Sequence, residues 1–255
     1  MDDNLQGRRA LVTGAASGIG RAVATHLAEL GGEVIVSDLP GAALDLVAKE
    51  IPVSLAIPAD LSVGDEVAAL AGEAGAVDIL VNNAGLQHVS PIEAFPVERW
   101  DLILAVMITA PFLLTRALLP AMYERQWGRV INIASVHGLV ASPYKVAYVT
   151  AKHGLLGMTK TTALEAAARC PDVTAHAICP SYVRTPLVEG QIAEQSTVHH
   201  LPEEEVVAEV LLASNAVKRL IEPVEVAQAV AWLCGSMAWT MTGGVLGMDA
   251  GWLAH

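Results

Sequence analysis

The chain has 255 residues, a length that one large α/β domain can account for. Hydrophobic residues make up 53% of it and charged residues 16%, which is enough for one sizeable core. The net charge of −12 is spread along the chain and argues against the basic surface of a nucleic-acid-binding protein.

The sequence carries no signal that we associate with membranes or secretion. No stretch of about 18 apolar residues is free of polar interruption, so we expect no membrane-spanning helix. The first residues are acidic, whereas a secretory signal begins with a basic and then an apolar segment. Cys170, Cys179 and Cys234 lie far apart and lack the spacing of a metal site. We therefore expect a cytoplasmic protein with reduced thiols and no metal.

Seven short apolar runs alternate with helical stretches along the chain. They cover residues 8–13, 33–37, 53–57, 77–82, 128–135, 173–179 and 244–249. Runs of this kind are typical of strands that helices bury on both faces. The alternation predicts an α/β fold, a single Rossmann-type domain over residues 1–255 with a doubly wound parallel sheet of about seven strands.

The segment 184–215 interrupts this alternation. It contains no predicted strand but several polar, acidic and histidine-containing stretches. It follows the sixth strand, at the carboxyl edge of the sheet, where ligands of such folds bind. We interpret it as a substrate lid, with a plain surface excursion as the alternative.

A glycine-rich turn follows the first strand and opens a helix. Gly14 allows a tight turn, Gly18 lets the backbone approach a pyrophosphate, and Gly20 allows the helix to pack closely on the strand. The helix N-terminus would offer its N–H groups to the phosphates. The pattern predicts a dinucleotide site that includes Thr13, Gly14, Ser17, Gly18, Ile19 and Gly20.

An acidic residue, Asp38, ends the second predicted strand. A carboxylate there accepts hydrogen bonds from both hydroxyls of the adenosine ribose and would repel the 2′-phosphate of NADP. No neighbouring basic residue offsets this charge, so the sequence favours NAD. A strand-end turn is the alternative role for Asp38. Asp60 and Leu61, after the third strand, could hold the adenine amine and cover the ring.

A tyrosine and a lysine provide the candidate chemistry. Tyr148 and Lys152 are four residues apart on a predicted helix, so they share a face. Tyrosine has a pKa of about 10, and a nearby ammonium favours the phenolate that a general base needs. Ser135, at the end of the fifth strand, could hold the substrate oxygen from the other side. A surface contact is the alternative for an isolated Tyr–Lys pair, but we predict that these three residues are catalytic.

Together, the glycine-rich turn, the run from Asn82 to Gly85, Ser135, Tyr148 and Lys152 resemble the short-chain dehydrogenase/reductase family over essentially the whole chain. The resemblance implies hydride transfer to or from a nicotinamide cofactor. It also implies that Lys152 binds the nicotinamide ribose. The cofactor-binding residues that it implies beyond the turn are Asn83, Ala84, Gly85, Tyr148, Lys152, Val183 and Thr185.

Within this family, four positions resemble the D-3-hydroxybutyrate dehydrogenases, which interconvert (R)-3-hydroxybutyrate and acetoacetate. Those enzymes bind the substrate carboxylate with two glutamines, a histidine and a lysine, which match Gln87, Gln191, His137 and Lys145. A carboxylate that leaves water needs several donors and a cation to replace its hydration. We therefore expect these four residues to bind the substrate; taken singly, each could instead be a packed or solvated side chain.

Three positions depart from the family pattern. Ser181 replaces a glycine, and Tyr182 stands where the related enzymes carry a tryptophan beside the substrate methyl, so a longer acyl tail could enter. Met107 falls on a catalytic asparagine, which in the family holds a helix distortion whose carbonyl binds a water of the proton path. Methionine favours a regular helix. We therefore expect an active but slowed enzyme, which Met107→Asn would accelerate.

Two further expectations concern assembly and rival functions. The predicted helices 99–124 and 148–170 would leave apolar faces uncovered, and with the family resemblance they predict a homotetramer. One rival function is a short-chain dehydrogenase for another 3-hydroxy acid or a secondary alcohol. The other is a cofactor-binding protein impaired in catalysis by Met107. Activity measured on a panel of substrates separates the three.

Overall fold

The computed structural model describes residues 4–186, 188–190, 192 and 202–254. Its centre is a sheet of seven strands in the order β3-β2-β1-β4-β5-β6-β7, and every neighbouring pair is parallel. The strands are β1 Arg9–Thr13, β2 Glu33–Asp38, β3 Leu55–Pro58, β4 Ile79–Asn82, β5 Gly128–Ile133, β6 Val173–Pro180 and β7 Val245–Met248. The predicted fold class is confirmed, and the predicted strand ends differ from the observed ones by at most two residues.

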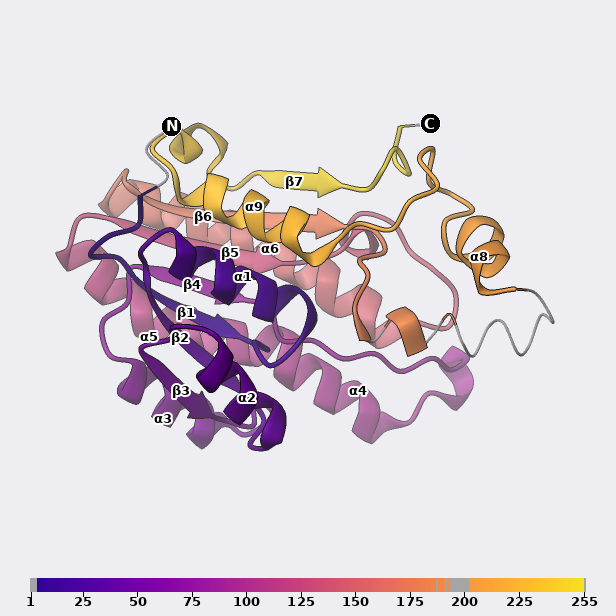
Figure 1. Ribbon diagram of the computed structural model, residues 1–255, viewed down its shortest axis with the longest axis horizontal. Coiled ribbons are helices and arrows are strands. Elements are labelled where there is room, and N and C mark those ends of the chain that lie inside the picture. Colours follow the sequence, from indigo (N-terminus) through magenta and orange to yellow (C-terminus); the bar gives the residue numbers. More distant parts are fainter. Residues whose placement is uncertain (1–3, 187, 191, 193–201, 255) are drawn as a thin grey trace.

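Helices cover both faces of the sheet (Figure 1). The α-helices whose bounds the described residues give are α1 Gly18–Glu29, α2 Ala42–Glu50, α3 Gly64–Ala74, α4 Val97–Leu104, α5 Ala110–Glu124, α6 Val146–Arg169, α8 Glu203–Glu205 and α9 Pro223–Cys234. α1, α2 and α9 pack on one face, and α3, α5 and α6 pack on the other.

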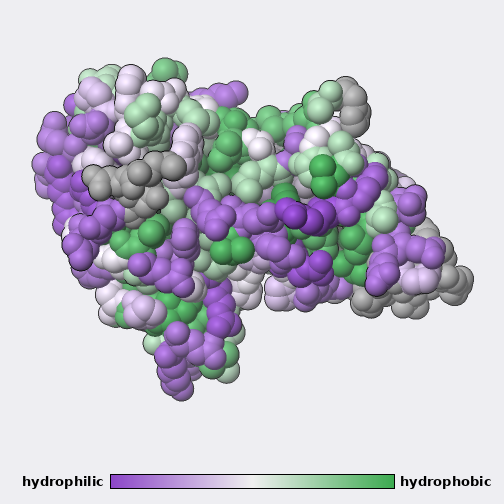
Figure 2. Space-filling model, turned by 45° about the horizontal axis from the view of Figure 1, so that its top comes forward, coloured by the Kyte–Doolittle hydropathy of each residue, from purple (hydrophilic) through white to green (hydrophobic). Residues whose placement is uncertain are grey.

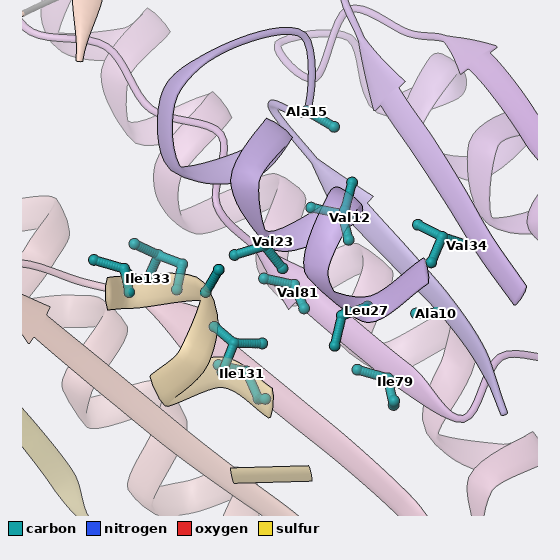
Figure 3. Packing of buried hydrophobic residues seen from close by; sticks show 14 of the residues in the cluster. Ala10, Val12, Ala15, Val23, Leu27, Val34, Ile79, Val81, Ile131 and Ile133 are labelled. Carbon is teal, nitrogen blue, oxygen red and sulfur yellow. The ribbon is translucent and has the colours of Figure 1, made fainter. Parts of the chain in front are cut away.

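Alternate side chains of the strands enter two separate cores. Val12 of β1 belongs to the core under α1 and α9, whereas its neighbour Leu11 belongs to the core under α3 and α5. Figure 3 shows Val12 beside Val23 and Leu27 of α1. Because each strand is apolar on both faces, it reads in the sequence as a continuous apolar run.

The fifth strand ends two residues earlier than expected. Ser135 was placed in the strand, but it instead caps a short 3-10 turn, Val136–Gly138, and its Oγ accepts a hydrogen bond of 3.2 Å from the N–H of His137. The turn directs the chain away from the sheet immediately after β5. Ser135 and His137 therefore both lie at the carboxyl edge.

The helix expected over 99–124 is interrupted. A π-helical turn, Ala105–Thr109, separates α4 from α5 and contains Met107. The expectation that methionine would keep this helix regular is therefore wrong.

Proline explains the π-helical turn. The N–H of Ala110 bonds to the carbonyl of Ala105, five residues back, instead of the carbonyl four residues back. Pro111 has no N–H to give to Met107, and its ring would clash with the Met107 carbonyl in a regular helix. The distortion that the family's asparagine accompanies thus arises here without asparagine.

By length and composition, one helical stretch, Val97–Glu124, could cross a membrane. A helix in the core of a protein can pass the same test, so the absence of a membrane-spanning helix stays a prediction. In the described part of the chain, 39% of its most apolar window is buried, and Leu114 and Leu118 belong to the core under the sheet. On the face in Figure 2, hydrophilic side chains lie between separate hydrophobic patches. Packing in the core accounts for the apolar character of the buried part of Val97–Glu124.

The described part of segment 184–215 has no strand, as expected. It contains α8 and a second π-helical turn, Val206–Leu211. Ile192, Val206 and Leu212 form a small core of their own with Leu220. That this segment acts as a substrate lid stays a prediction.

Candidate active site

A cleft of about 550 Å³ opens at the carboxyl edge of the sheet. Most of the residues that we predicted to bind the cofactor line it. They are Gly14, Ser17, Gly18, Ile19, Asp38, Asp60, Leu61, Asn83, Ala84, Gly85, Tyr148, Lys152, Val183 and Thr185. The turns after β1, β2, β3 and β4 thus meet in one elongated cavity, as a dinucleotide requires.

The two remaining predicted cofactor residues, Thr13 and Gly20, lie behind the cleft and shape it. A Cβ on Gly20 would lie 2.1 Å from the carbonyl oxygen of Gly14, so only glycine permits this approach of α1 to the turn. Gly14 has a φ of +63°, and a Cβ there would lie 2.7 Å from the Cα of Ala84. These glycines keep the floor of the cleft as bare backbone.

Asn83 connects the glycine-rich turn to the end of β4. Its Nδ2 donates hydrogen bonds of 2.9 Å to the carbonyl of Thr13 and 3.0 Å to that of Gly14. The Oγ1 of Thr13 accepts a bond of 3.1 Å from the N–H of Asn83. Five groups from two segments are thereby satisfied, and the turn is fixed before any ligand binds.

Asp38 ends β2 at the rim of the cleft. Its two carboxylate oxygens accept hydrogen bonds of 2.8 Å from the N–H groups of Ala16 and Leu39. Lys152 is the only Lys or Arg among the described residues that line this cleft. The ribose end of the cleft therefore presents one negative charge and no cation.

The three predicted catalytic residues lie together at the far end of the cleft. Tyr148 and Lys152 are on α6, and the Lys152 Nζ lies 5.5 Å from the centroid of the Tyr148 ring. Ser135 and Tyr148 line the same small cavity, and the side chain of Ser135 lowers the pKa of Tyr148. The Lys152 Nζ also donates a bond of 2.7 Å to the carbonyl of Ile133. The site thus joins α6 to the end of β5.

Burial opposes ionisation of both Tyr148 and Lys152. It raises the pKa of Tyr148, and the side chain of Ser135 partly offsets this rise. Burial lowers the pKa of Lys152 to about 8, so this residue stays protonated at neutral pH. The sequence analysis expected the nearby Lys152 to favour the phenolate of Tyr148, but here burial raises the pKa of Tyr148 instead. A further positive charge, such as that of an oxidised nicotinamide, would be needed to favour the phenolate.

A smaller cavity of about 70 Å³ adjoins the catalytic residues. It is lined by Gln87, Ser135, Val136, His137, Lys145, Tyr148, Ser181, Tyr182, Val188 and Trp252. Three of the four predicted carboxylate-binding residues thus share one cavity with Ser135 and Tyr148. The fourth, Gln191, lies outside the described residues.

Trp252 is a lining residue that the sequence analysis missed. Its ring stacks on Tyr182, with centroids 6.1 Å apart and planes inclined by 16°, and meets His137 edge to face at 5.6 Å. It follows the seventh strand, and the carboxyl ends of parallel strands share one edge. That position was the signal that could have identified it.

Lys145 is the cation that the small cavity offers. Burial lowers its pKa. Burial, followed by the charges of Lys145 and His153, lowers the pKa of His137 to about 4, so His137 is neutral at pH 7. The Nε2 of His137 lies 2.6 Å from the Oγ of Ser142, which fixes the ring. One cation and one oriented neutral ring therefore face the same space.

Comparisons with known proteins identify the family. A family model described as short chain dehydrogenase matches residues 8–196. The chain is 45% identical to the D-beta-hydroxybutyrate dehydrogenase of Rhizobium meliloti (strain 1021), with 97% of this chain and 99% of that protein covered. It is 42% identical to the protein of the same name from Cupriavidus necator, with 98% and 100% covered.

A solved structure is also similar. It is that of a Beutenbergia cavernae protein described as a candidate NAD(P) dependent gluconate 5-dehydrogenase, with NADP bound at low occupancy. The two chains are 31% identical and superpose with a TM-score of 0.85, and both are covered in full.

Proposed function

The chain belongs to the short chain dehydrogenase family, and from that premise we propose that it interconverts (R)-3-hydroxybutyrate and acetoacetate with NAD. One observation carries the proposal: the cavity that contains Ser135 and Tyr148 also contains Lys145, His137 and Gln87. An acid whose carboxylate contacts Lys145 would have its C3 oxygen within reach of the catalytic residues. The volume of the cavity, about 70 Å³, favours a small acid.

Tyr148 acts as the general acid and base in this proposal. It takes the proton of the C3 hydroxyl during oxidation and returns it during reduction, while Ser135 holds the same oxygen. Lys152, held by Ile133, keeps a positive charge beside the phenolate that forms. NAD supplies the hydride acceptor when bound.

The residues at the adenosine end of the cleft favour NAD. The Asp38 carboxylate could accept hydrogen bonds from the ribose hydroxyls, and the cleft-lining residues near it offer no cation for a 2′-phosphate. The bare backbone at Gly14 and Gly18 leaves room for the pyrophosphate. A structure of a related protein holds NADP, so both cofactors belong in the test.

We also propose a cytoplasmic homotetramer. Phe112 of α5 is 49% exposed and Leu164 of α6 is 76% exposed, so apolar surface on both helices is uncovered in the single chain. Three buried free cysteines suit a reducing compartment. Light scattering should give four times the chain mass at micromolar concentration. A monomer would contradict the assembly.

The test of the function is NADH formation from (R)-3-hydroxybutyrate, with the (S) isomer measured beside it. We expect turnover of the (R) isomer and little of the (S) isomer. Butan-2-ol, which lacks the carboxylate, should react poorly, because the donors around it would stay unpaired. Equal efficiency with butan-2-ol would overturn the assignment of Lys145 and His137.

A further inference from the structure

The small cavity carries more hydroxyl groups than (R)-3-hydroxybutyrate can use. Ser135 and Tyr148 serve the C3 oxygen, and Gln87, His137 and Lys145 serve the carboxylate. Ser181 and Tyr182, which each carry a hydroxyl, also line the cavity. The remaining carbon of this acid, C4, is a methyl group with no polar atom to offer them.

Ser181 is held with its hydroxyl proton available. Its Oγ accepts a hydrogen bond of 3.0 Å from the Nδ2 of Asn215, which is buried and also donates a bond of 2.9 Å to the carbonyl of Asp249. An oxygen that accepts in this way can still donate its own proton. Ser181 lines both the large cleft and the small cavity, so it lies where cofactor and substrate would meet.

Tyr182 is fixed by its ring. The ring stacks on Trp252, and the Nζ of Lys145 lies 5.8 Å from its centroid. Burial raises the pKa of Tyr182, so its hydroxyl is neutral and can both donate and accept. Tyr182 and Tyr148 line the same small cavity.

Resting on the function proposed above, we propose that the cavity selects 3-hydroxy acids with a second hydroxyl on C4, the 3,4-dihydroxybutyrate class, with Ser181 and Tyr182 as the specificity-determining residues. With the carboxylate at Lys145 and the C3 oxygen at Tyr148, C4 faces the remaining lining groups. A hydroxyl suits them better than an ammonium, which Lys145 would repel.

The reaction is the same oxidation. C3 gives up a hydride to NAD⁺, and its hydroxyl proton goes to Tyr148. The products are 4-hydroxy-3-oxobutyrate, NADH and one proton. The C4 hydroxyl is unchanged and serves only for binding.

The test compares two acids of nearly equal size, one with a C4 hydroxyl and one with a methyl group in its place. The first is the enantiomer of 3,4-dihydroxybutyrate that superimposes on (R)-3-hydroxybutyrate; it is named (S) because the C4 hydroxyl changes the order of priorities. The second is (R)-3-hydroxypentanoate. We expect kcat/KM for the dihydroxy acid to be higher by about tenfold, the effect of one or two hydrogen bonds to neutral groups. A ratio of one or less would overturn the proposal.

Variants assign the effect to the two hydroxyls. Ser181→Ala and Tyr182→Phe should each lower the ratio of the two efficiencies by about threefold or more. Tyr144→Phe is the matched control, because Tyr144 is 59% exposed and does not line the cavity. An unchanged ratio in both cavity variants would overturn the assignment. Should either variant fail to fold, the wild-type ratio alone decides.

The same panel separates this proposal from the function on which it rests. Oxidation of (R)-3-hydroxybutyrate and (R)-3-hydroxypentanoate without preference for the dihydroxy acid would overturn the specificity alone. No oxidation of any 3-hydroxy acid would overturn both.

Discussion

Lys152 donates a hydrogen bond of 2.7 Å to the carbonyl oxygen of Ile133, the last residue of β5. The lysine is only 4% exposed, and burial lowers its pKa from 10.5 to about 8. At neutral pH the folded protein therefore holds a buried ammonium at a cost in stability of about 3 kcal/mol. A buried ammonium that lowers the stability of the fold indicates a functional role for Lys152.

Replacing this lysine should separate stability from activity. Lys152→Met removes the buried charge with similar length, although it leaves the Ile133 carbonyl without its donor, which costs about 1–3 kcal/mol. We expect an unfolding free energy in urea that is unchanged or higher, together with a fall in kcat of about 100-fold or more. A variant that is both less stable and fully active would show that the bond serves the fold.

Asp38 should determine the choice of cofactor. Asp38→Ser keeps a group that can accept from the N–H of Ala16 but removes the charge. We expect wild-type kcat/KM to favour NAD over NADP by at least about tenfold, and the variant to lose most of this preference.

The control is an acid elsewhere in the same cleft. Asp60 bonds to Ser62 through its side chain and lies at the adenine end. Asp60→Asn should affect both cofactors equally and leave their ratio unchanged. Comparable wild-type efficiency with NAD and NADP would contradict the assignment.

Patterns within short segments predicted most of this cleft. The glycines at 14, 18 and 20 and Asp38 follow from the first strand, helix and second strand, whose order fixes where each turn must lie. The spacing of Tyr148 and Lys152 likewise fixes their common face on α6. These predictions needed only local geometry and the rule that parallel strands share a carboxyl edge.

Where a feature depends on contacts between residues distant in sequence, the prediction was missing or wrong. Trp252 reaches the small cavity from the end of the chain through its stack on Tyr182, and no local pattern indicates that contact. The raised pKa of Tyr148 depends on how its surroundings bury the phenol, which the spacing to Lys152 does not reveal. Pro111 was a local signal of the π-helical turn, because it has no N–H to donate to the Met107 carbonyl. The prediction of a regular helix considered only the helix propensity of Met107.

His137 and Lys145 should govern capture of the substrate. Replacing either with Ala should lower kcat/KM for acetoacetate by about 10- to 100-fold, because a charge-assisted bond is worth about 1.5–3 kcal/mol. The dissociation constant of NADH, measured by fluorescence titration, should not change. Unchanged efficiency in both variants would place the carboxylate elsewhere.

The protonation of His137 gives a further check on the same variants. Its pKa of about 4 means that it stays neutral as the pH falls through the usual histidine value of 6.5. The KM for acetoacetate should therefore show no transition near pH 6.5. A His137-dependent transition there would mean that the imidazolium binds the carboxylate. Ser142→Ala, which frees the ring, should raise KM more than it lowers kcat.

Pro111 should maintain the geometry that the family's asparagine accompanies. In the π-helical turn the N–H of Ala110 bonds to the carbonyl of Ala105, so the carbonyl of Val106 loses its α-helical donor. The carbonyl of Met107 also lacks an α-helical donor, because Pro111 has no N–H. Val106 lines the large cleft, and Met107 packs in one cluster with Tyr148. Backbone acceptors are therefore released next to the catalytic helix.

Pro111→Ala restores a donor for the Met107 carbonyl and favours a regular helix. We expect kcat to fall by about three- to tenfold, the value of one hydrogen bond, while NAD affinity and melting temperature are kept. Met107→Asn in the wild-type background should change turnover less than first expected, because the turn already exists without asparagine. In the Pro111→Ala background, Met107→Asn should recover part of the lost kcat. If Pro111→Ala is as fast as the wild type, the released carbonyls take no part in turnover and the proton leaves Tyr148 by another route.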